Sequence, residues 1–128
     1  MEERGADQGH IVNLNSMSGH RMSPTVGFMF YTGTKYAVTA LTEGTRLELR
    51  QKKSKIRVTS ISPGLVRTEF RGRSCRSEDM EASKKAYDDI CEEVLESEDI
   101  AAAVLYALAA PARVDVNDIF IRPTTQLG

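Results

Sequence analysis

The stretch that decides the fold is KIRVTSISPG, which runs from Lys55 to Gly64. Its IRVTSIS portion is short, apolar and rich in β-branched residues, and it ends at a Pro-Gly pair, which is typical of a buried strand followed by a turn. A similar run, GHIVNLNS, spans Gly9 to Ser16, and NDIFIRP spans Asn117 to Pro123. The sequence therefore predicts three strands, spread over almost the whole chain.

Helical patterns lie between these strands. FMFYTGTKYAVTALTEGTRLELRQ, from Phe28 to Gln51, repeats small and apolar residues at three- and four-residue spacing, and its small-residue face is suited to close approach of another helix. SEDIAAAVLYALAAP, from Ser97 to Pro111, begins with a candidate serine cap and two acids and stops at proline. A further helix is expected from about Ser83 to Leu95, within a polar stretch.

Strands that alternate with helices indicate an α/β fold with a parallel sheet and helices packed on its faces. Three strands make a small sheet with unpaired edges, and the first begins almost at the start of the chain. We expect the second half of a larger doubly wound domain. A complete three-stranded α/β domain is the alternative.

Composition excludes several classes of protein. The chain has 128 residues and a net charge of −1, so nucleic acid is not favoured as a partner. Cys75 and Cys91 form no metal-ligand pattern, and two histidines, His10 and His20, are too few for a histidine-based metal site. The apolar run from Ile100 to Ala110 is too short to cross a bilayer, and the N-terminus has no signal-peptide core. We expect a cytoplasmic protein without a metal.

The sequence YTGTK, from Tyr31 to Lys35, places a phenol and an ammonium on one helix face. Alone, this spacing is common and also fits a surface helix. Its surroundings make it informative, because the first strand ends at Ser16 and the next ends in SPGLVRT, which contains Pro63 and Thr68. Ligands of open α/β sheets bind outside the carboxyl ends of the strands, where these segments are expected to meet.

These residues resemble the motifs of the short-chain dehydrogenase/reductase family. The family pattern Asn-x-Ser-Ser-x-x-Gly appears as NLNSMSG, with Asn15 in place of the first serine, and Ser16 corresponds to the catalytic serine. Ser18 is a rival because it is nearer to Tyr31 in sequence, but the terminal glycine aligns Ser16. The motif Tyr-x-x-x-Lys matches Tyr31 and Lys35. The resemblance covers almost the whole chain and implies a Rossmann-like sheet.

The resemblance also implies a chemistry, which is hydride transfer between a nicotinamide cofactor and a carbonyl or secondary alcohol. A neighbouring ammonium favours the ionised form of a phenol, so Tyr31 would be the general acid or base and Lys35 would tune it. Lys35 would also bind the nicotinamide ribose, and Ser16 would hold the substrate oxygen. By the family motif PGLVRT, the nicotinamide would be flanked by Pro63, Gly64, Val66 and Thr68. The cofactor would be NADP, with NAD as the alternative.

Each assignment has a simpler alternative. Ser16 can end a strand and bind a neighbouring backbone group, and Pro63-Gly64 can be only a turn. Thr68 can cap a helix. His20 is taken as a loop residue and Cys75 as a plain loop thiol.

The sequence lacks the family's Gly-x-x-x-Gly-x-Gly phosphate loop, so residues 1–128 are expected to form the catalytic half of the domain only and to bind NADP weakly. Within the family, the residues around these motifs are similar to those of an animal branch, which includes carbonyl and hydroxysteroid reductases and insect farnesol dehydrogenases. Two functions follow. The first is an oxidoreductase acting on a steroid, isoprenoid alcohol or dicarbonyl. The second is a catalytically silent module that pairs with a full-length subunit, and a homo-oligomer is also expected.

Overall fold

The computed structural model describes residues 8–22, 27–70 and 92–126. Strands, helices and one 3-10 turn alternate along this part of the chain. In order, the elements are β1 (His10–Leu14), η2 (Met17–Gly19), α1 (Met29–Gln51), β2 (Arg57–Pro63), α4 (Ser97–Ala109) and β3 (Asp118–Ile121).

The three strands form one parallel sheet in the order β1-β2-β3. Val12 of β1 lies opposite Thr59 of β2, and Ile61 lies opposite Ile119 of β3. The predicted parallel α/β fold is therefore confirmed. Because all three strands run in the same direction, their carboxyl ends lie at the same end of the sheet. The sequence predicts the candidate site at this end.

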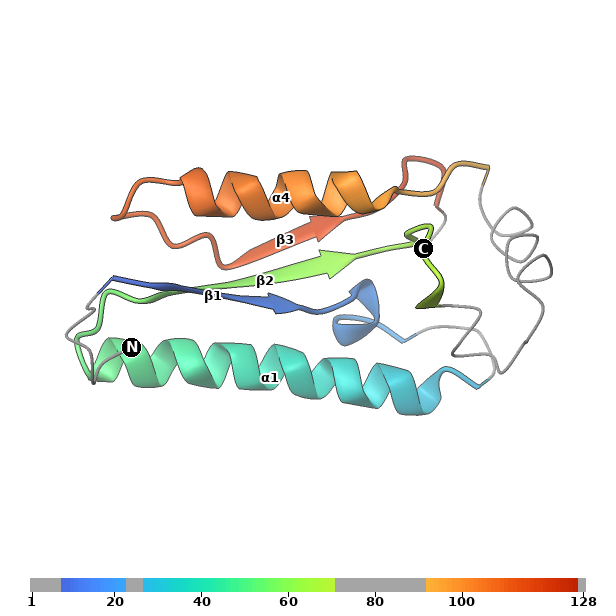
Figure 1. Cartoon of the computed structure of the whole chain (residues 1–128). Helices are drawn as coiled ribbons and strands as arrows, with labels where there is room; N and C mark the ends of the chain where they lie inside the picture. Colours follow the sequence, from blue (N-terminus) through green and yellow to red (C-terminus); the bar gives the residue numbers. More distant parts are fainter. Residues whose placement is uncertain (1–7, 23–26, 71–91, 127–128) are drawn as a thin grey trace.

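Helices cover both faces of the sheet (Figure 1), with α1 on one side and α4 on the other. On the α1 side, the Asn13 side-chain amide donates to Thr42 Oγ1 at 2.9 Å. On the α4 side, the Arg57 guanidinium donates to the carbonyl of Ala107 at 3.2 Å. Adjacent residues of a strand point to opposite faces, so each strand contributes to both layers.

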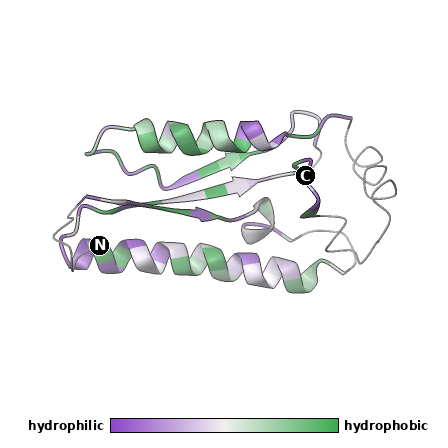
Figure 2. Cartoon of the chain, viewed as in Figure 1, coloured by the Kyte–Doolittle hydropathy of each residue, from purple (hydrophilic) through white to green (hydrophobic). Residues whose placement is uncertain are grey.

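The core is centred on β2, where every residue from Val58 to Pro63 is buried. Ile56, Val58 and Ile61 are at most 3% exposed, and complete burial of such a side chain contributes about 1.5–3 kcal/mol. The same strand also buries three hydroxyl side chains, Thr59, Ser60 and Ser62. Figure 2 shows the mixed hydropathy of this strand beside the more hydrophobic α4.

The buried side chains of α1 are threonines and not large apolar residues. Thr32 and Thr42 are its buried residues. The small residues at positions 37 and 40, which the sequence marked as a contact face, are exposed in this chain. The fully buried positions of α1 are therefore polar.

Two sequence expectations need correction. The N-cap of α4 is Glu96, not Ser97, and the Glu96 backbone N–H donates to Asp99 Oδ2 at 2.8 Å, which supplies the cap from inside the first turn. The helix expected from Ser83 to Leu95 lies mostly outside the described residues. Its last four positions are not helical, because Leu95 instead forms a parallel bridge with Val66.

Candidate active site

Ser16 lies immediately beyond the carboxyl end of β1. The ladder extends one residue past the strand, since the Asn15 N–H donates to the Ile61 carbonyl at 2.8 Å. Ser16 then becomes the N-cap of η2, and its Oγ accepts the Ser18 backbone N–H at 3.1 Å. This is the local hydrogen bond that the simpler reading of Ser16 expected. It occupies only an acceptor position, so the hydroxyl hydrogen of Ser16 stays available as a donor.

Gly19 allows this turn to approach α1 closely. A Cβ at Gly19 would lie 2.7 Å from both Asn15 Oδ1 and the Lys35 carbonyl, which leaves no room for a side chain. A chain of hydrogen bonds holds the same contact, because the Asn15 amide donates to Thr39 Oγ1 and Thr39 donates to the Gly19 carbonyl, each at 2.9 Å. The Ser16 turn is thus fixed against the helix that carries Tyr31 and Lys35.

Tyr31 and Lys35 face each other on consecutive turns of α1, as their spacing predicted. The Lys35 ammonium nitrogen lies 5.7 Å from the centroid of the Tyr31 ring, within the range of a cation–π contact. Lys35 Nζ also donates to the Leu14 carbonyl at 3.0 Å, at the end of β1. Burial lowers the pKa of the Lys35 ammonium from its ordinary value. The lysine therefore connects the phenol to the segment that carries Ser16.

Aromatic side chains flank Tyr31. The ring of Phe28 meets it edge-on with centroids 6.0 Å apart, and the ring of Phe70 lies 5.6 Å away at a tilt of 49°. Phe70 belongs to the segment after β2, so this contact brings that segment beside the phenol. Two aromatic rings, one from each segment, therefore border the phenol.

The turn after β2 holds the remaining predicted residues. Gly64 follows Pro63 directly and donates its N–H to the Ile121 carbonyl at 2.7 Å, which fixes the turn to the end of β3. Val66 pairs with Leu95, and Thr68 Oγ1 accepts the Phe70 N–H at 3.3 Å.

That last bond fits the expectation of Thr68 as a cap. The structure therefore links Lys35 both to Tyr31 and, through the Leu14 carbonyl, to the strand end that precedes Ser16, and the contact of Phe70 with Tyr31 joins the segment of Thr68 to α1.

Sequence reasoning missed three residues at this edge of the sheet. Gln126 accepts the Leu65 N–H at 3.0 Å and contacts Met17 Sδ at 2.8 Å, so it links the turn after β2 to η2. His20, taken as a loop residue, contacts both β2 and β3. Phe70 stands against Tyr31. No spacing in the sequence signals these contacts, because each joins residues that are distant along the chain.

Comparison with models of protein families shows which family the chain belongs to. The family model described as short chain dehydrogenase matches residues 1–79, which is more than half of the chain. The chain belongs to the short-chain dehydrogenase family. The predicted family membership is thereby confirmed, and the family placement covers Ser16, Tyr31, Lys35 and the turn after β2.

Individual members of the short-chain dehydrogenase family align over nearly the full chain. Human dehydrogenase/reductase SDR family member 11 is 49% identical over 127 residues, which is 99% of this chain and 48% of the human protein. Farnesol dehydrogenase from Aedes aegypti is 45% identical over 123 residues, which is 96% of this chain and 45% of that enzyme. The chain therefore spans about half the length of the curated relatives it matches.

Solved structures agree on the fold. The closed form of serine dehydrogenase complexed with NADP+ superposes with a TM-score of 0.85 at 33% identity and covers 98% of this chain and 48% of that one. Levodione reductase superposes with a TM-score of 0.73 at 26% identity, over 93% of this chain and 47% of that one. The sheet and helices therefore match those of Rossmann-like short-chain dehydrogenase structures.

Two further findings concern the described residues only. None of the helices in this part of the chain is both long and apolar enough to cross a membrane. No group of three or more His, Cys, Asp or Glu side chains within it is placed to hold a metal ion. Cys75 and Cys91 lie outside the residues that the structure describes.

Proposed function

We propose that residues 1–128 form the catalytic half of an NAD(P)-dependent oxidoreductase that interconverts a carbonyl and a secondary alcohol. The observation that supports this most directly is the position of Lys35. Its ammonium lies over the Tyr31 ring and donates to the Leu14 carbonyl, two residues before Ser16. A proton donor, its charged neighbour and a second hydroxyl thus belong to one connected unit.

The three residues divide the work of carbonyl reduction. Tyr31 donates the proton to the carbonyl oxygen as the alcohol forms, and it takes the proton back in the oxidation direction. The positive charge of Lys35 stabilises the phenolate that remains after proton transfer. The Ser16 hydroxyl, with its hydrogen unused by the Ser18 contact, donates to the same substrate oxygen and holds it beside Tyr31.

A nicotinamide cofactor supplies the hydride when bound, and the donor set present fits its nicotinamide end. An ammonium carries three N–H donors, and the contact of Lys35 with Leu14 uses one, which leaves donors for ribose hydroxyls. Pro63, Gly64, Val66 and Thr68 would border the ring. We favour NADP, because serine dehydrogenase was solved with NADP+. NAD is the alternative, and binding by this chain alone would be weak, because its sequence has no glycine-rich phosphate loop.

The substrate would be a steroid, an isoprenoid alcohol or a dicarbonyl. Phe28 and Phe70 beside Tyr31 support an apolar substrate, and one relative is named farnesol dehydrogenase. We propose a cytoplasmic location for this reaction.

The test is NADPH consumption with a dicarbonyl substrate, comparing the chain with its Tyr31→Phe variant. Loss of the phenolic hydroxyl removes the proton donor, so the rate should fall by about 10²–10⁴-fold. Tyr36→Phe is the matched control, since Tyr36 is 42% exposed on the same helix and has no part in the proposed chemistry. Equal background rates in the chain and in both variants would contradict the proposed oxidoreductase activity.

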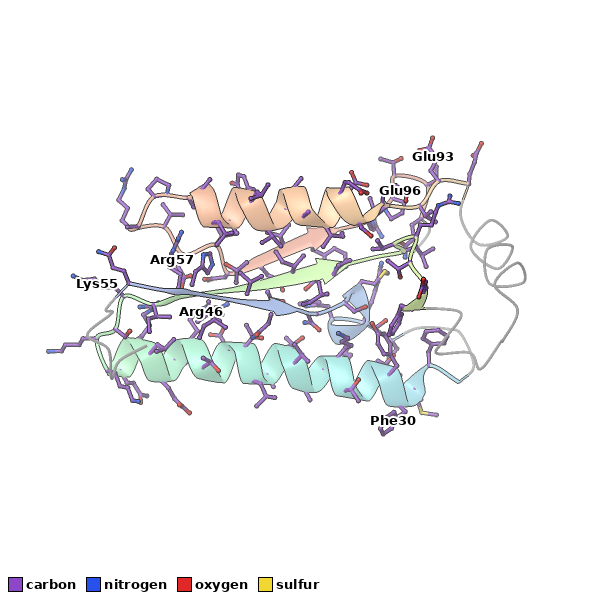
Figure 3. All side chains as sticks on the ribbon, viewed as in Figure 1. Phe30, Arg46, Lys55, Arg57, Glu93 and Glu96 are labelled. Carbon is purple, nitrogen blue, oxygen red and sulfur yellow. The ribbon has the colours of Figure 1, made fainter. Side chains whose placement is uncertain are left out.

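Exposed residues of α1 support a second candidate, the silent module that pairs with a full-length subunit or with a second copy. Phe30 is 85% exposed and projects from the start of α1 away from the sheet (Figure 3), and Leu41 is 69% exposed. Such side chains on one helix suit a protein interface. Background rates in the assay above, together with a dimeric mass in solution, would favour this candidate.

A further inference from the structure

His20 contacts both β2 and β3 from the segment that follows the Ser16 turn. Its Nε2 lies 2.9 Å from Ser62 Oγ on β2 and 3.1 Å from Asp118 Oδ2 on β3. Its ring meets Phe120 of β3 edge-on, with centroids 5.6 Å apart. The Arg21 guanidinium lies 5.7 Å from the same Phe120 ring. The segment after η2 is therefore attached to the sheet at several points.

The hydrogen atoms in this cluster can be assigned from chemistry. Ser62 Oγ donates to Asp118 Oδ1 at 2.8 Å, so its hydroxyl hydrogen is used. A carboxylate can only accept, so the contact between Asp118 and His20 requires a hydrogen on Nε2. That N–H points at Ser62 Oγ, which accepts, and Asp118 Oδ2 lies 3.1 Å from the same nitrogen. All three groups are thus mutually satisfied, with Ser62 fully buried beneath them.

The cluster lies between the two parts of the candidate site. On one side, η2 connects His20 back to Ser16, because the His20 N–H donates to the Met17 carbonyl and the Gly19 N–H donates to the Ser16 carbonyl. On the other side, Ser62 directly precedes Pro63 and the turn that would border the nicotinamide. A single side chain thus links the segment that holds the substrate oxygen to the segment that orients the cofactor.

We propose that His20 is a positioning residue that sets the separation between the Ser16 hydroxyl and the Pro63-Gly64 turn. Its catalytic consequence rests on the proposed function, whereas its effect on the Ser16 turn does not. Hydride transfer requires the reacting atoms at a defined separation, and small displacements of the groups that hold them reduce the rate strongly. Supporting contacts that fix such groups are needed for this reason.

Two amide variants test the proposal. In His20→Gln the amide nitrogen falls near the position of Nε2, whereas in His20→Asn it is one methylene too short to reach Ser62 and Asp118. Amide hydrogen exchange of Ser18 and Gly19, which bond to Ser16 Oγ and the Ser16 carbonyl, measures how firmly the turn is held.

We expect His20→Asn to accelerate exchange of these two amides about tenfold, as for the loss of one part-buried hydrogen bond, and His20→Gln to restore protection. Exchange at Thr42 and Val58 should not change.

His10 provides the matched control, because its Nε2 also contacts a hydroxyl of β2, Thr59 Oγ1, at 2.6 Å. It does so from β1 itself and not from the Ser16 turn. His10→Asn should leave the Ser18 and Gly19 amides unchanged. Unchanged exchange in His20→Asn, equal acceleration at all amides, or failure of His20→Asn to fold would each overturn a local positioning role.

Kinetics provide the second readout. His20→Asn should lower kcat for dicarbonyl reduction about tenfold with little change in KM, and His20→Gln should recover most of it. A change in KM alone would contradict the proposal. If the parent chain shows no turnover, the proposed function fails, and the exchange measurements still decide whether His20 holds the Ser16 turn.

Discussion

At the amino ends of the strands, charged side chains bind the protein's own backbone, whereas at the carboxyl ends Ser16 and Lys35 keep hydrogen-bond donors that no contact within the described residues uses. Arg46 donates to the carbonyls of Val58 and Asn117, each at 3.0 Å. On the other side of the sheet (Figure 3), Arg57 donates to the Ala107 and Ala110 carbonyls at the end of α4.

Asp115 joins the amino-end network, since its Oδ1 accepts the Val58 N–H at 3.0 Å and its Oδ2 lies 3.4 Å from an Arg50 nitrogen. A helix end leaves carbonyls without intrahelical partners, and Arg57 satisfies two such carbonyls at the end of α4. One end of the sheet therefore uses its charges for stability, whereas the donors of Ser16 and Lys35 at the other end are the groups that the proposed function requires. Substitutions at the two ends should therefore affect different properties.

The largest expected effect on stability is at the amino end. Arg46→Met leaves the carbonyls of Val58 and Asn117 each without one partner, and the Arg46 side chain that it replaces is only 12% exposed, so the free energy of unfolding should fall by about 2–4 kcal/mol in urea denaturation. Arg67→Met is the control. The Arg67 side chain is 44% exposed in its contact with Glu96, so this substitution should lower the free energy of unfolding by at most about 1 kcal/mol. Equal losses would remove the distinction between structural and surface arginines.

A smaller loss is expected where the Ser16 turn meets α1. Gly19→Ala places a Cβ against backbone as well as side-chain atoms, which cannot move without separating η2 from the helix. The free energy of unfolding should fall by about 1–3 kcal/mol, and the Ser18 amide should exchange faster. An alanine variant with unchanged stability would show that the turn is loosely placed, which would weaken the geometric basis of the site.

Gly44→Ala sharpens this comparison because the sign should reverse. Gly44 lies inside α1, and among the described residues no atom outside its chain neighbours and its own helix backbone lies within 4 Å of the Cβ it would gain. Alanine favours helix over glycine, so the free energy of unfolding should rise by about 0.5–1 kcal/mol in the same urea experiment. A loss would instead indicate that the exposed small-residue face of α1 makes close contacts in solution, for example with a second copy.

The smallest expected effect is a pH dependence from His10. Burial, and next the charge of Arg57, hold the pKa of the His10 imidazole below its ordinary value of 6.5, while Asp115 opposes them. The unfolded state therefore binds the proton more tightly, so the free energy of unfolding should decrease as the pH falls from 6.5 toward the lowered pKa. His10→Gln should flatten this slope in urea titrations between about pH 5 and 8. If the slope were the same in His10→Gln, groups other than His10 would be responsible for the pH dependence.

Element types were predictable because each depends on local pattern. The β-branched run before Pro63 gave β2, and the spacing from Phe28 to Gln51 gave α1 to within one residue. The cap of α4 was wrong, since which of Glu96 and Ser97 takes the cap position depends on backbone angles that the composition does not fix. The prediction that residues 92–95 are helical was wrong, because Leu95 is extended and forms a parallel β-bridge with Val66.

Tyr31 and Lys35 were also predictable as a pair, because helical geometry alone places residues four apart on one face. Their link to Ser16 through the Leu14 carbonyl was not, since it depends on how closely α1 packs on the end of β1.

The sequence by itself determined the three strands, the two main helices, the parallel sheet and the family to which the chain belongs. These follow from periodicity and motifs that act over a few residues. Only the tertiary structure decided that Gly19 must be small, that Gln126 joins η2 to the turn after β2, and that His20 reaches Ser62 and Asp118. The physical reason is distance along the chain, because these contacts form only after separate elements pack and no local pattern of residues encodes them.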